Sequence, residues 1–144
     1  MGLDKIMSSN LYCLEASRTV FEAAEVMCEK KIGAIIVGSP KKIEGIFSER
    51  DILNKIVAKS KDPKKVKLSE VMSSPVKSIA VSVDPHEALT AMNKNYFRHL
   101  PVSGEDGAIV GMLSIRDLFG YIVKRQDEEN ESLLQFLSAD GPGG

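Results

Sequence analysis

The chain has 144 residues, of which 43% are hydrophobic and 27% charged, and its 19 basic and 20 acidic side chains give a formal net charge of −1. This near balance excludes a strongly basic nucleic-acid-binding protein and an acidic disordered protein. The sequence shows neither an apolar run long enough to cross a bilayer nor a secretory signal, and its two cysteines fit neither a disulfide framework nor a zinc site. We therefore expect a cytoplasmic protein with no membrane partner.

The first half of the chain predicts a short strand, a helix, two strands and a second helix. Thr19 is a favoured N-cap residue, and apolar residues follow it at helical spacing as far as Met27. Segments 34–37 and 43–47 are apolar and are separated by turn residues, as expected of a hairpin. The second helix follows directly, and we expect one buried face from its apolar residues Ile52, Leu53, Ile56 and Val57.

The second half predicts the same elements in the same order. Asp84 caps a helix with Pro85 at its first position, and strands are expected at 99–102 and 109–113. The last helix carries Leu118, Phe119, Ile122 and Val123 on its expected buried face. Its helical signal then continues over 124–137, which is acidic in the middle and becomes apolar again at Leu133, Leu134, Phe136 and Leu137. We expect this extension to pack on a partner chain and residues 140–144 to be disordered.

The two halves are copies of one unit. Met7-Ser8-Ser9 recurs 65 residues later as Met72-Ser73-Ser74. Gly45-Ile46-Phe47-Ser48-Glu49-Arg50-Asp51 recurs 66 residues later as Gly111-Met112-Leu113-Ser114-Ile115-Arg116-Asp117. The repeat predicts one unit over 1–60 and another over 71–125, joined by a linker at 61–70 and followed by a C-terminal extension over 126–144.

The linker region is basic, with five lysines among the nine residues of 59–67. Because no aromatic residue is interleaved for base stacking, we interpret it as a solvated connection rather than a phosphate-binding or partner-binding patch. Nucleic acid is therefore not an expected partner.

The residues that most enzymes need are missing. His86 and His99 are the two histidines, and they occupy unrelated positions in their copies. There is no nucleophile elbow, phosphate-binding Walker loop, dinucleotide fingerprint or metal-ligand spacing. We therefore predict no catalytic residue, metal site or catalytic cofactor. His86 is expected at the surface, Cys13 and Cys28 as buried thiols, and four methionines as core residues: Met7, Met27, Met72 and Met92.

A Ser-x-Arg-Asp sequence marks the strand-to-helix junction of each copy. Ser48 would lie at the start of a helix, where free backbone N–H groups and the helix dipole favour a phosphate, and Arg50 would add a charged fork. Asp51 could accept hydrogen bonds from both hydroxyls of a ribose. The same spacing also suits simple helix capping, and the residues by themselves favour neither interpretation. Ser114, Arg116 and Asp117 are the equivalents in the second copy.

The two copies resemble CBS domains, which pair as a Bateman module. Both junctions fit the family pattern Gly-hydrophobic-hydrophobic-Ser/Thr-x-x-Asp, and Arg98-His99-Leu100-Pro101-Val102 is similar to its Leu-Pro-Val strand. The resemblance covers 5–123. It implies an α+β fold of two strand–helix–strand–strand–helix units in a pseudo-twofold arrangement, packed through their sheets with two clefts between them.

The resemblance also implies adenosine-nucleotide binding in those clefts. Asp51 and Asp117 match the ribose-binding aspartates, and Arg98 with His99 match a basic pair that contacts phosphates in the nucleotide-sensing subunit of AMP-activated kinase. The remaining implied ligand-binding residues are Ser48 and Ser114, Arg50 and Arg116, the helix-start residues Thr19 and Asp84, and the apolar walls Ala24, Ile32, Leu89 and Phe97.

Two departures from the family predict unequal clefts. The first copy has Gly33-Ala34 where the second has the basic pair, and Asp84 places a negative charge where family members have Thr or Ser. One cleft is therefore expected to bind AMP, ADP or ATP well and the other weakly or not at all.

Together these features predict a stand-alone regulatory module, an energy or metabolite sensor that forms a homodimer and acts on an unidentified partner protein. Two alternatives stay open. The aspartates would bind the ribose and would not distinguish how many phosphates a ligand carries, so S-adenosylmethionine or a dinucleotide would also fit. If the serines and aspartates only cap helices, the chain is a ligand-free interaction or dimerisation module.

Overall fold

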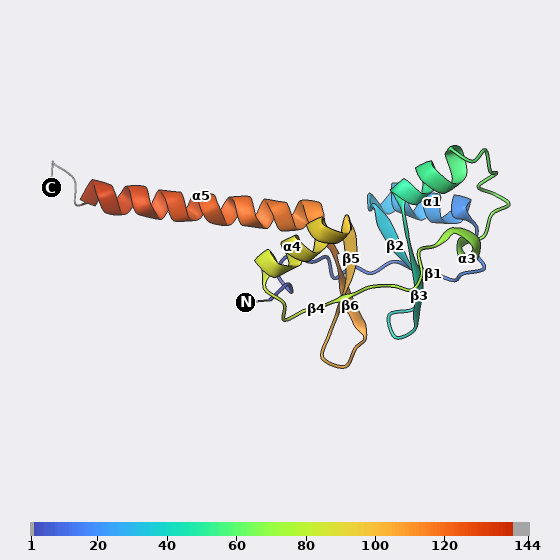
Figure 1. Ribbon diagram of the computed structural model, residues 1–144, viewed down its shortest axis with the longest axis horizontal. Helices are drawn as coiled ribbons and strands as arrows, with labels where there is room; N and C mark the ends of the chain where they lie inside the picture. The colour runs from blue at the N-terminus through green and yellow to red at the C-terminus, as the bar shows by residue number, and fades with distance from the viewer. Residues whose placement is uncertain (1, 140–144) are drawn as a thin grey trace.

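The computed structural model describes residues 2–139, so the disorder expected for 140–144 concerns residues outside the described part of the chain. It forms two three-stranded sheets, each flanked by helices (Figure 1). The first sheet has the order β1 (Cys13–Leu14), β2 (Ala34–Gly38), β3 (Ile43–Ser48). The second has the order β4 (Ile79–Ala80), β5 (His99–Ser103), β6 (Ile109–Ser114). In both sheets the first pair is parallel and the second antiparallel, which confirms the predicted α+β fold of two equivalent units.

Both predicted helix starts are confirmed. α1 (Val20–Lys30) is capped by Thr19, whose hydroxyl accepts a hydrogen bond from the Glu22 amide at 3.2 Å. α4 (Pro85–Asn95) is capped by Asp84, whose carboxylate accepts from the His86 amide at 2.9 Å. Side-chain caps satisfy amides that the first helical turn leaves without partners. The two units therefore share a side-chain cap at the equivalent helix start.

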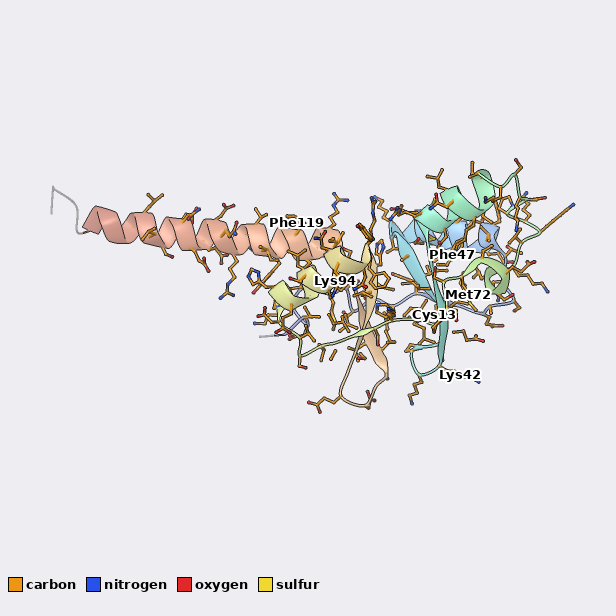
Figure 2. The ribbon with its side chains drawn as sticks, in the orientation of Figure 1. Cys13, Lys42, Phe47, Met72, Lys94 and Phe119 are labelled. Carbon is orange, nitrogen blue, oxygen red and sulfur yellow. The ribbon has the colours of Figure 1, made fainter. Side chains whose placement is uncertain are left out.

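The prediction of one buried face on the second helices is half wrong. In the first unit this helix consists of α2 (Glu49–Asp51) and the π-helical η1 (Ile52–Val57), and in the second it is α5 (Ile115–Ala139). Ile56 and Leu118 are buried, whereas the side chains named at the end of this paragraph are 48–64% exposed. Neighbouring residues on a helix point about 100° apart, so a helix packed on one side buries one member of each apolar pair. The exposed members are Leu53, Val57, Phe119 and Val123, and Phe119 stands on the outer side of α5 (Figure 2).

Each unit completes its core with the leading turn of the other. Leu3 and Ile6, near the start of the chain, are buried in the core of the second unit. Leu68 and Val71, from α3 (Leu68–Val71), are buried in the core of the first unit. The second pair follows the first by 65 residues, so the exchange is reciprocal. The end of the expected 61–70 linker is thus core rather than solvated chain.

The exchanged segments are also fastened through backbone and glycine contacts. Ser8 exchanges two backbone hydrogen bonds with Met112, both of 2.9 Å, and Ser73 makes the equivalent pair with Ile46 at 2.9 and 3.1 Å. Directly beside these bridges, a Cβ on Gly111 would collide with the Met7 side chain and a Cβ on Gly45 with that of Met72. Glycine therefore stands in both junction motifs because a methionine of the other unit occupies the space of a side chain (Figure 2 shows Met72 there).

Of the remaining predictions for single residues, those for the methionines and His86 are confirmed and that for Cys28 is wrong. Met27 and Met92 are buried and Met7 and Met72 are partly buried, as predicted of core methionines. His86 is exposed, also as predicted. The cysteine prediction is wrong for Cys28, which is exposed, while Cys13 is half-buried. Burial raises the pKa of the Cys13 thiol.

We predict that Gly45→Ala destabilises the fold by about 1–3 kcal/mol, because the new methyl group must displace Met72 in a packed site. Gly120→Ala is the matched control: nothing lies within 4 Å of its Cβ position on α5, so it should be neutral or stabilise by up to about 1 kcal/mol. Urea unfolding of both variants measures the difference. Equal stability of Gly45→Ala and the wild type would contradict the packing argument.

Candidate functional site

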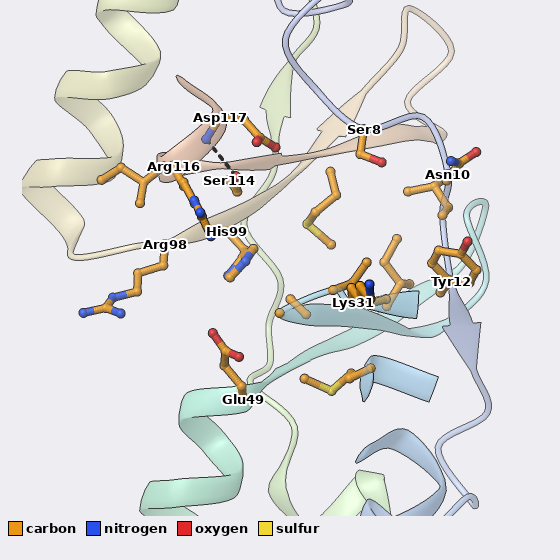
Figure 3. Close-up of a pocket in the computed structure, with 18 of the residues that line it drawn as sticks. Ser8, Asn10, Tyr12, Lys31, Glu49, Arg98, His99, Ser114, Arg116 and Asp117 are labelled. Carbon is orange, nitrogen blue, oxygen red and sulfur yellow. Dashed lines mark hydrogen bonds between the residues drawn. The ribbon is translucent and has the colours of Figure 1, made fainter. Parts of the chain in front are cut away.

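A cavity of about 790 Å³ lies between the two units. Its walls come from the segment after Met7, from α1 and β2 of the first unit, and from the β5 and β6 ends of the second (Figure 3). This volume is in the range of small-molecule sites. The cavity brings together half of the predicted ligand-binding residues: Ala24, Ile32, Arg98, His99, Ser114, Arg116 and Asp117.

The polar residues of the second unit reach the cavity because two of its loops are tied together. Arg98 and His99 stand at the start of β5, and Ser114 ends β6 where α5 begins. The backbone amide of Ile115 donates to the carbonyl of Arg98 at 2.8 Å, which holds these two points side by side. The first unit has the same tie, from the amide of Glu49 to the carbonyl of Gly33 at 3.0 Å.

The duplicated aspartates differ in their bonding. The Asp51 carboxylate accepts from the Ser48 amide at 2.9 Å and from the Ser48 hydroxyl at 3.2 Å, and it pairs with Lys55 at 3.2 Å. In the second unit the Ser114 hydroxyl accepts from the Asp117 amide at 3.0 Å. Among the residues that the structure describes, none makes a hydrogen bond or an ion pair with the carboxylate of Asp117. Asp51 is thus committed to capping, whereas the Asp117 carboxylate is available to a ligand.

A sequence difference explains this asymmetry. Lys55 lies one turn after Asp51, and its equivalent 66 residues later is Tyr121. The Tyr121 hydroxyl accepts a hydrogen bond from Arg125 at 3.1 Å instead of balancing Asp117. Replacing a cation by a neutral phenol therefore leaves the second aspartate without its helical counter-ion.

Charges of both signs line the cavity. Lys31, Arg98 and Arg116 supply positive charge, and Asp117 and Glu49 supply negative charge. Glu49 comes from α2 of the first unit and points across toward the second unit (Figure 3). No group of three or more His, Cys, Asp or Glu side chains suited to a metal ion occurs among the described residues.

His99 is a half-buried titratable group of this cavity. Burial lowers its pKa from the ordinary value of 6.5, Glu49 and Asp117 act in the opposite direction, and Arg98 adds to the lowering. The lowered pKa favours the neutral form of the imidazole. A Cβ on Gly33 would stand 3.0 Å from Nε2 of His99 and 3.3 Å from a carboxylate oxygen of Glu49, so glycine at this point leaves room for both side chains.

The other half of the predicted site residues lies outside this cavity. Thr19 and Asp84 hold the helix caps, and Ser48 with Asp51 form the capping box described above. Leu89 and Phe97 pack against the core of the second unit, and Arg50 does not line the cavity either. The structure thus brings half of the predicted residues together in one cavity. The other half lie in helix caps, in the core of the second unit or, for Arg50, elsewhere outside the cavity.

Several lining residues were not predicted, among them Asn10, Tyr12, Lys31 and Glu49. Comparison of the two copies could not reveal them, because Tyr12 aligns with Lys77 and Lys31 with Tyr96. Glu49 carried one usable signal: it is the acidic residue directly after Ser48, at the very start of a helix facing the cleft.

Comparisons with known proteins agree with this architecture. A family model for the CBS domain matches residues 3–58 and again 68–124. The mitochondrial CBS domain-containing protein CBSX3 of Arabidopsis thaliana is 34% identical over 131 residues, which is 88% of this chain and 61% of the relative. The chain thus spans less than two thirds of that relative's length.

Solved structures show the same fold. A protein with CBS domains from Burkholderia ambifaria MC40-6 superposes with a TM-score of 0.81 and 29% identity, covering 88% of this chain and 96% of the other. A CBS domain protein from Pyrobaculum aerophilum, solved in complex with AMP, superposes with a TM-score of 0.73 and 27% identity, covering 81% and 89%. This chain belongs to the CBS domain family and carries two such domains in tandem.

Proposed function

We propose that the chain is a regulatory module that binds an adenosine nucleotide, AMP, ADP or ATP, in the cavity between its two units. The observation that carries this proposal is the carboxylate of Asp117, which no residue in the described part of the chain engages and which shares one cavity with Arg98, Arg116 and His99. A carboxylate that accepts from both hydroxyls recognises a ribose, and neighbouring cations favour phosphate. The AMP complex of the Pyrobaculum relative supports the choice of nucleotide.

Each part of the nucleotide has a complementary surface in the cavity. Ala24 and Ile32 offer apolar surface to the base, with Tyr12 beside them. The ribose would meet Asp117. The phosphate would lie near the Ser114 hydroxyl and the start of α5, where the positive end of a long helix adds to Arg98 and Arg116.

The second cleft, around Asp51, is proposed to bind weakly or not at all. A ligand there would have to break the bonds of Asp51 to Ser48 and Lys55. S-adenosylmethionine or a dinucleotide remains the alternative for the first cavity, because Asp117 reads the ribose in all of these ligands. A ligand-free interaction module is the remaining alternative.

Regulation follows from where the ligand lies. The cavity takes residues from both units, so a bound nucleotide favours one arrangement of the units over another, and a partner protein senses that arrangement. We propose a homodimer as the assembly that presents this change, with the exposed Leu53 and Val57 as part of its contact surface. The protein thus acts through binding rather than catalysis.

We predict that Asp117→Ala weakens AMP binding by about tenfold or more, because two charge-assisted hydrogen bonds are lost. Asp51→Ala is the matched control: it should lower stability by about 1 kcal/mol through loss of the cap and change AMP affinity by less than about twofold. Isothermal titration with AMP and 2′-deoxy-AMP measures both effects. Two equivalent sites in the wild type, or equal losses in the two variants, would contradict the proposal.

Glu49 is predicted to select against additional phosphates. Its carboxylate faces His99 on the phosphate side, so each further negative charge on the ligand is repelled. Glu49→Gln should raise the affinity for ATP by about threefold or more and that for AMP by less. The exposed Glu44→Gln on β3, outside the cavity, is the control. An unchanged ratio of ATP to AMP affinity would exclude this role.

The affinity for AMP is predicted to rise as the pH falls from 8 toward 6.5. Burial holds the pKa of His99 below its ordinary value in the free protein, and a bound phosphate dianion would raise it. The complex then binds more protons than the free protein, so binding strengthens as the pH falls through the pKa of His99 in the complex toward its lower pKa in the free protein. Titration of wild type and His99→Asn measures this, with adenosine as the ligand that lacks phosphate. A wild-type slope equal to that of His99→Asn would contradict it.

A further inference from the structure

The basic segment between the two units, residues 59–67, is fixed to the first unit. The backbone amide of Val20, at the start of α1, donates to the carbonyl of Val66 at 2.9 Å. Near the other end of the segment, the amide of Lys61 donates to the carbonyl of Ile56 at 3.0 Å. Buried residues of α3 follow directly. The segment is thus part of the surface of the first unit, and its backbone presents the lysines from fixed positions.

Five exposed lysines of this segment have no ion-pair partner among the residues that the structure describes. The two acidic residues nearby hold the backbone instead. The Asp62 carboxylate accepts from the amide of Lys64 at 2.9 Å, and the Glu70 carboxylate accepts from the amide of Lys67 at 2.7 Å. Positive charge therefore remains in excess on this surface, which we call the lysine cluster: Lys59, Lys61, Lys64, Lys65 and Lys67.

The lysine cluster lies at the opposite end of the molecule from the acidic part of α5. Its segment is the green loop at one end of the long axis, and α5 projects from the other end (Figure 1). α5 carries exposed acidic side chains at 127, 128, 129 and 131. Charges at opposite ends of the molecule are screened from each other, because the Debye length is about 8 Å at physiological salt. The acidic helix therefore does not neutralise the lysine cluster, which is available to an acidic partner.

We infer that the lysine cluster binds an acidic segment of a partner protein, a stretch with several Asp or Glu side chains. The inference rests on the proposed function in one respect, since that function calls for a partner protein, and it adds the chemistry by which the partner is recognised. Complementary charges speed association and exclude basic partners. Because the cluster lies outside the cavity, a nucleotide and the partner can bind the same chain at once.

Three features of this surface favour carboxylates over nucleic acid or lipid. The cluster consists of lysine, whereas bidentate recognition of phosphate is typical of arginine, and the adjacent Arg18 is held in an ion pair of 3.3 Å. Phe21 lies beside the cluster, but the Lys64 ammonium stands 4.9 Å from the centroid of its ring and competes for the face on which a base would stack. Pro63 and Val66, the apolar residues of the segment, are half-buried and offer little apolar surface to a lipid layer.

Fluorescence anisotropy with a fluorescein-labelled peptide of ten glutamates tests the inference on the full chain, without nucleotide. We expect the wild type to bind this peptide and Lys61→Glu, Lys65→Glu to weaken binding by about tenfold or more, because two attractive charges become repulsive. Lys41→Glu, Lys42→Glu makes the same change in net charge on the exposed β2–β3 hairpin and should weaken binding by less than about twofold (Figure 2 shows Lys42 there). A wild type that does not bind, or equal losses in the two variants, would overturn the inference.

Two further probes decide the class of partner. A labelled oligonucleotide of ten thymidylates carries about the same charge as the peptide, and vesicles with about 30% phosphatidylserine present an anionic lipid surface. We expect both to bind more weakly than the peptide. Tighter binding of either probe, lost with Lys61→Glu, Lys65→Glu, would assign the lysine cluster to nucleic acid or lipid and overturn the inference.

These measurements are independent of the nucleotide site. The Lys61→Glu, Lys65→Glu variant should bind AMP as the wild type does, because no lysine of the cluster lines the cavity. Peptide binding by a chain that fails to bind AMP would contradict the proposed nucleotide site and support the role of the lysine cluster. AMP binding without peptide binding would do the reverse.

Discussion

The whole molecule depends on the reciprocal packing of each leading turn against the other unit. Met7 fills the space beside Gly111 and Met72 the space beside Gly45, while Leu3 and Leu68 complete opposite cores. Each unit thus buries part of its core with a segment that precedes the other unit, so the two cores depend on each other. The same crossing carries the chain from Ser8 to Tyr12 along the cavity wall. The site therefore exists because the cores are shared.

Within this symmetric frame, a few residues that differ between the two copies give the two aspartates different bonding partners. Lys55 holds Asp51 inside a capping box, whereas Tyr121 leaves Asp117 without a counter-ion. His99 of the basic pair lies beside Gly33, and Glu49 places a negative charge at the same point of the cavity. The two copies thus share one backbone arrangement, and the residues that differ between them leave Asp51 in a capping box and Asp117 outside one.

α5 connects the proposed ligand site with exposed apolar side chains far from the cavity. Its first turn carries Asp117, its next turns pack on the second core, and its far end presents Leu133. A ligand that shifts the start of a rigid helix moves its far end with it, so occupancy of the cavity and the position of this exposed surface become linked. This linkage offers a physical route from nucleotide binding to a signal that a partner protein can detect.

The sequence by itself determined the local structure and the repeat. Thr19 and Asp84 indicate where helices begin, and the apolar runs indicate the hairpins. The recurrence of two motifs, 65 and 66 residues apart, identifies two equivalent units. All of these signals can be found in the sequence because caps and periodicity depend on neighbours in the chain. The tertiary structure decided the rest. It alone showed that Leu3 and Leu68 exchange cores, that Leu53 and Phe119 face outward, and that Tyr12 and Glu49 enter the cavity. These outcomes depend on contacts between residues distant in sequence, which no local pattern records.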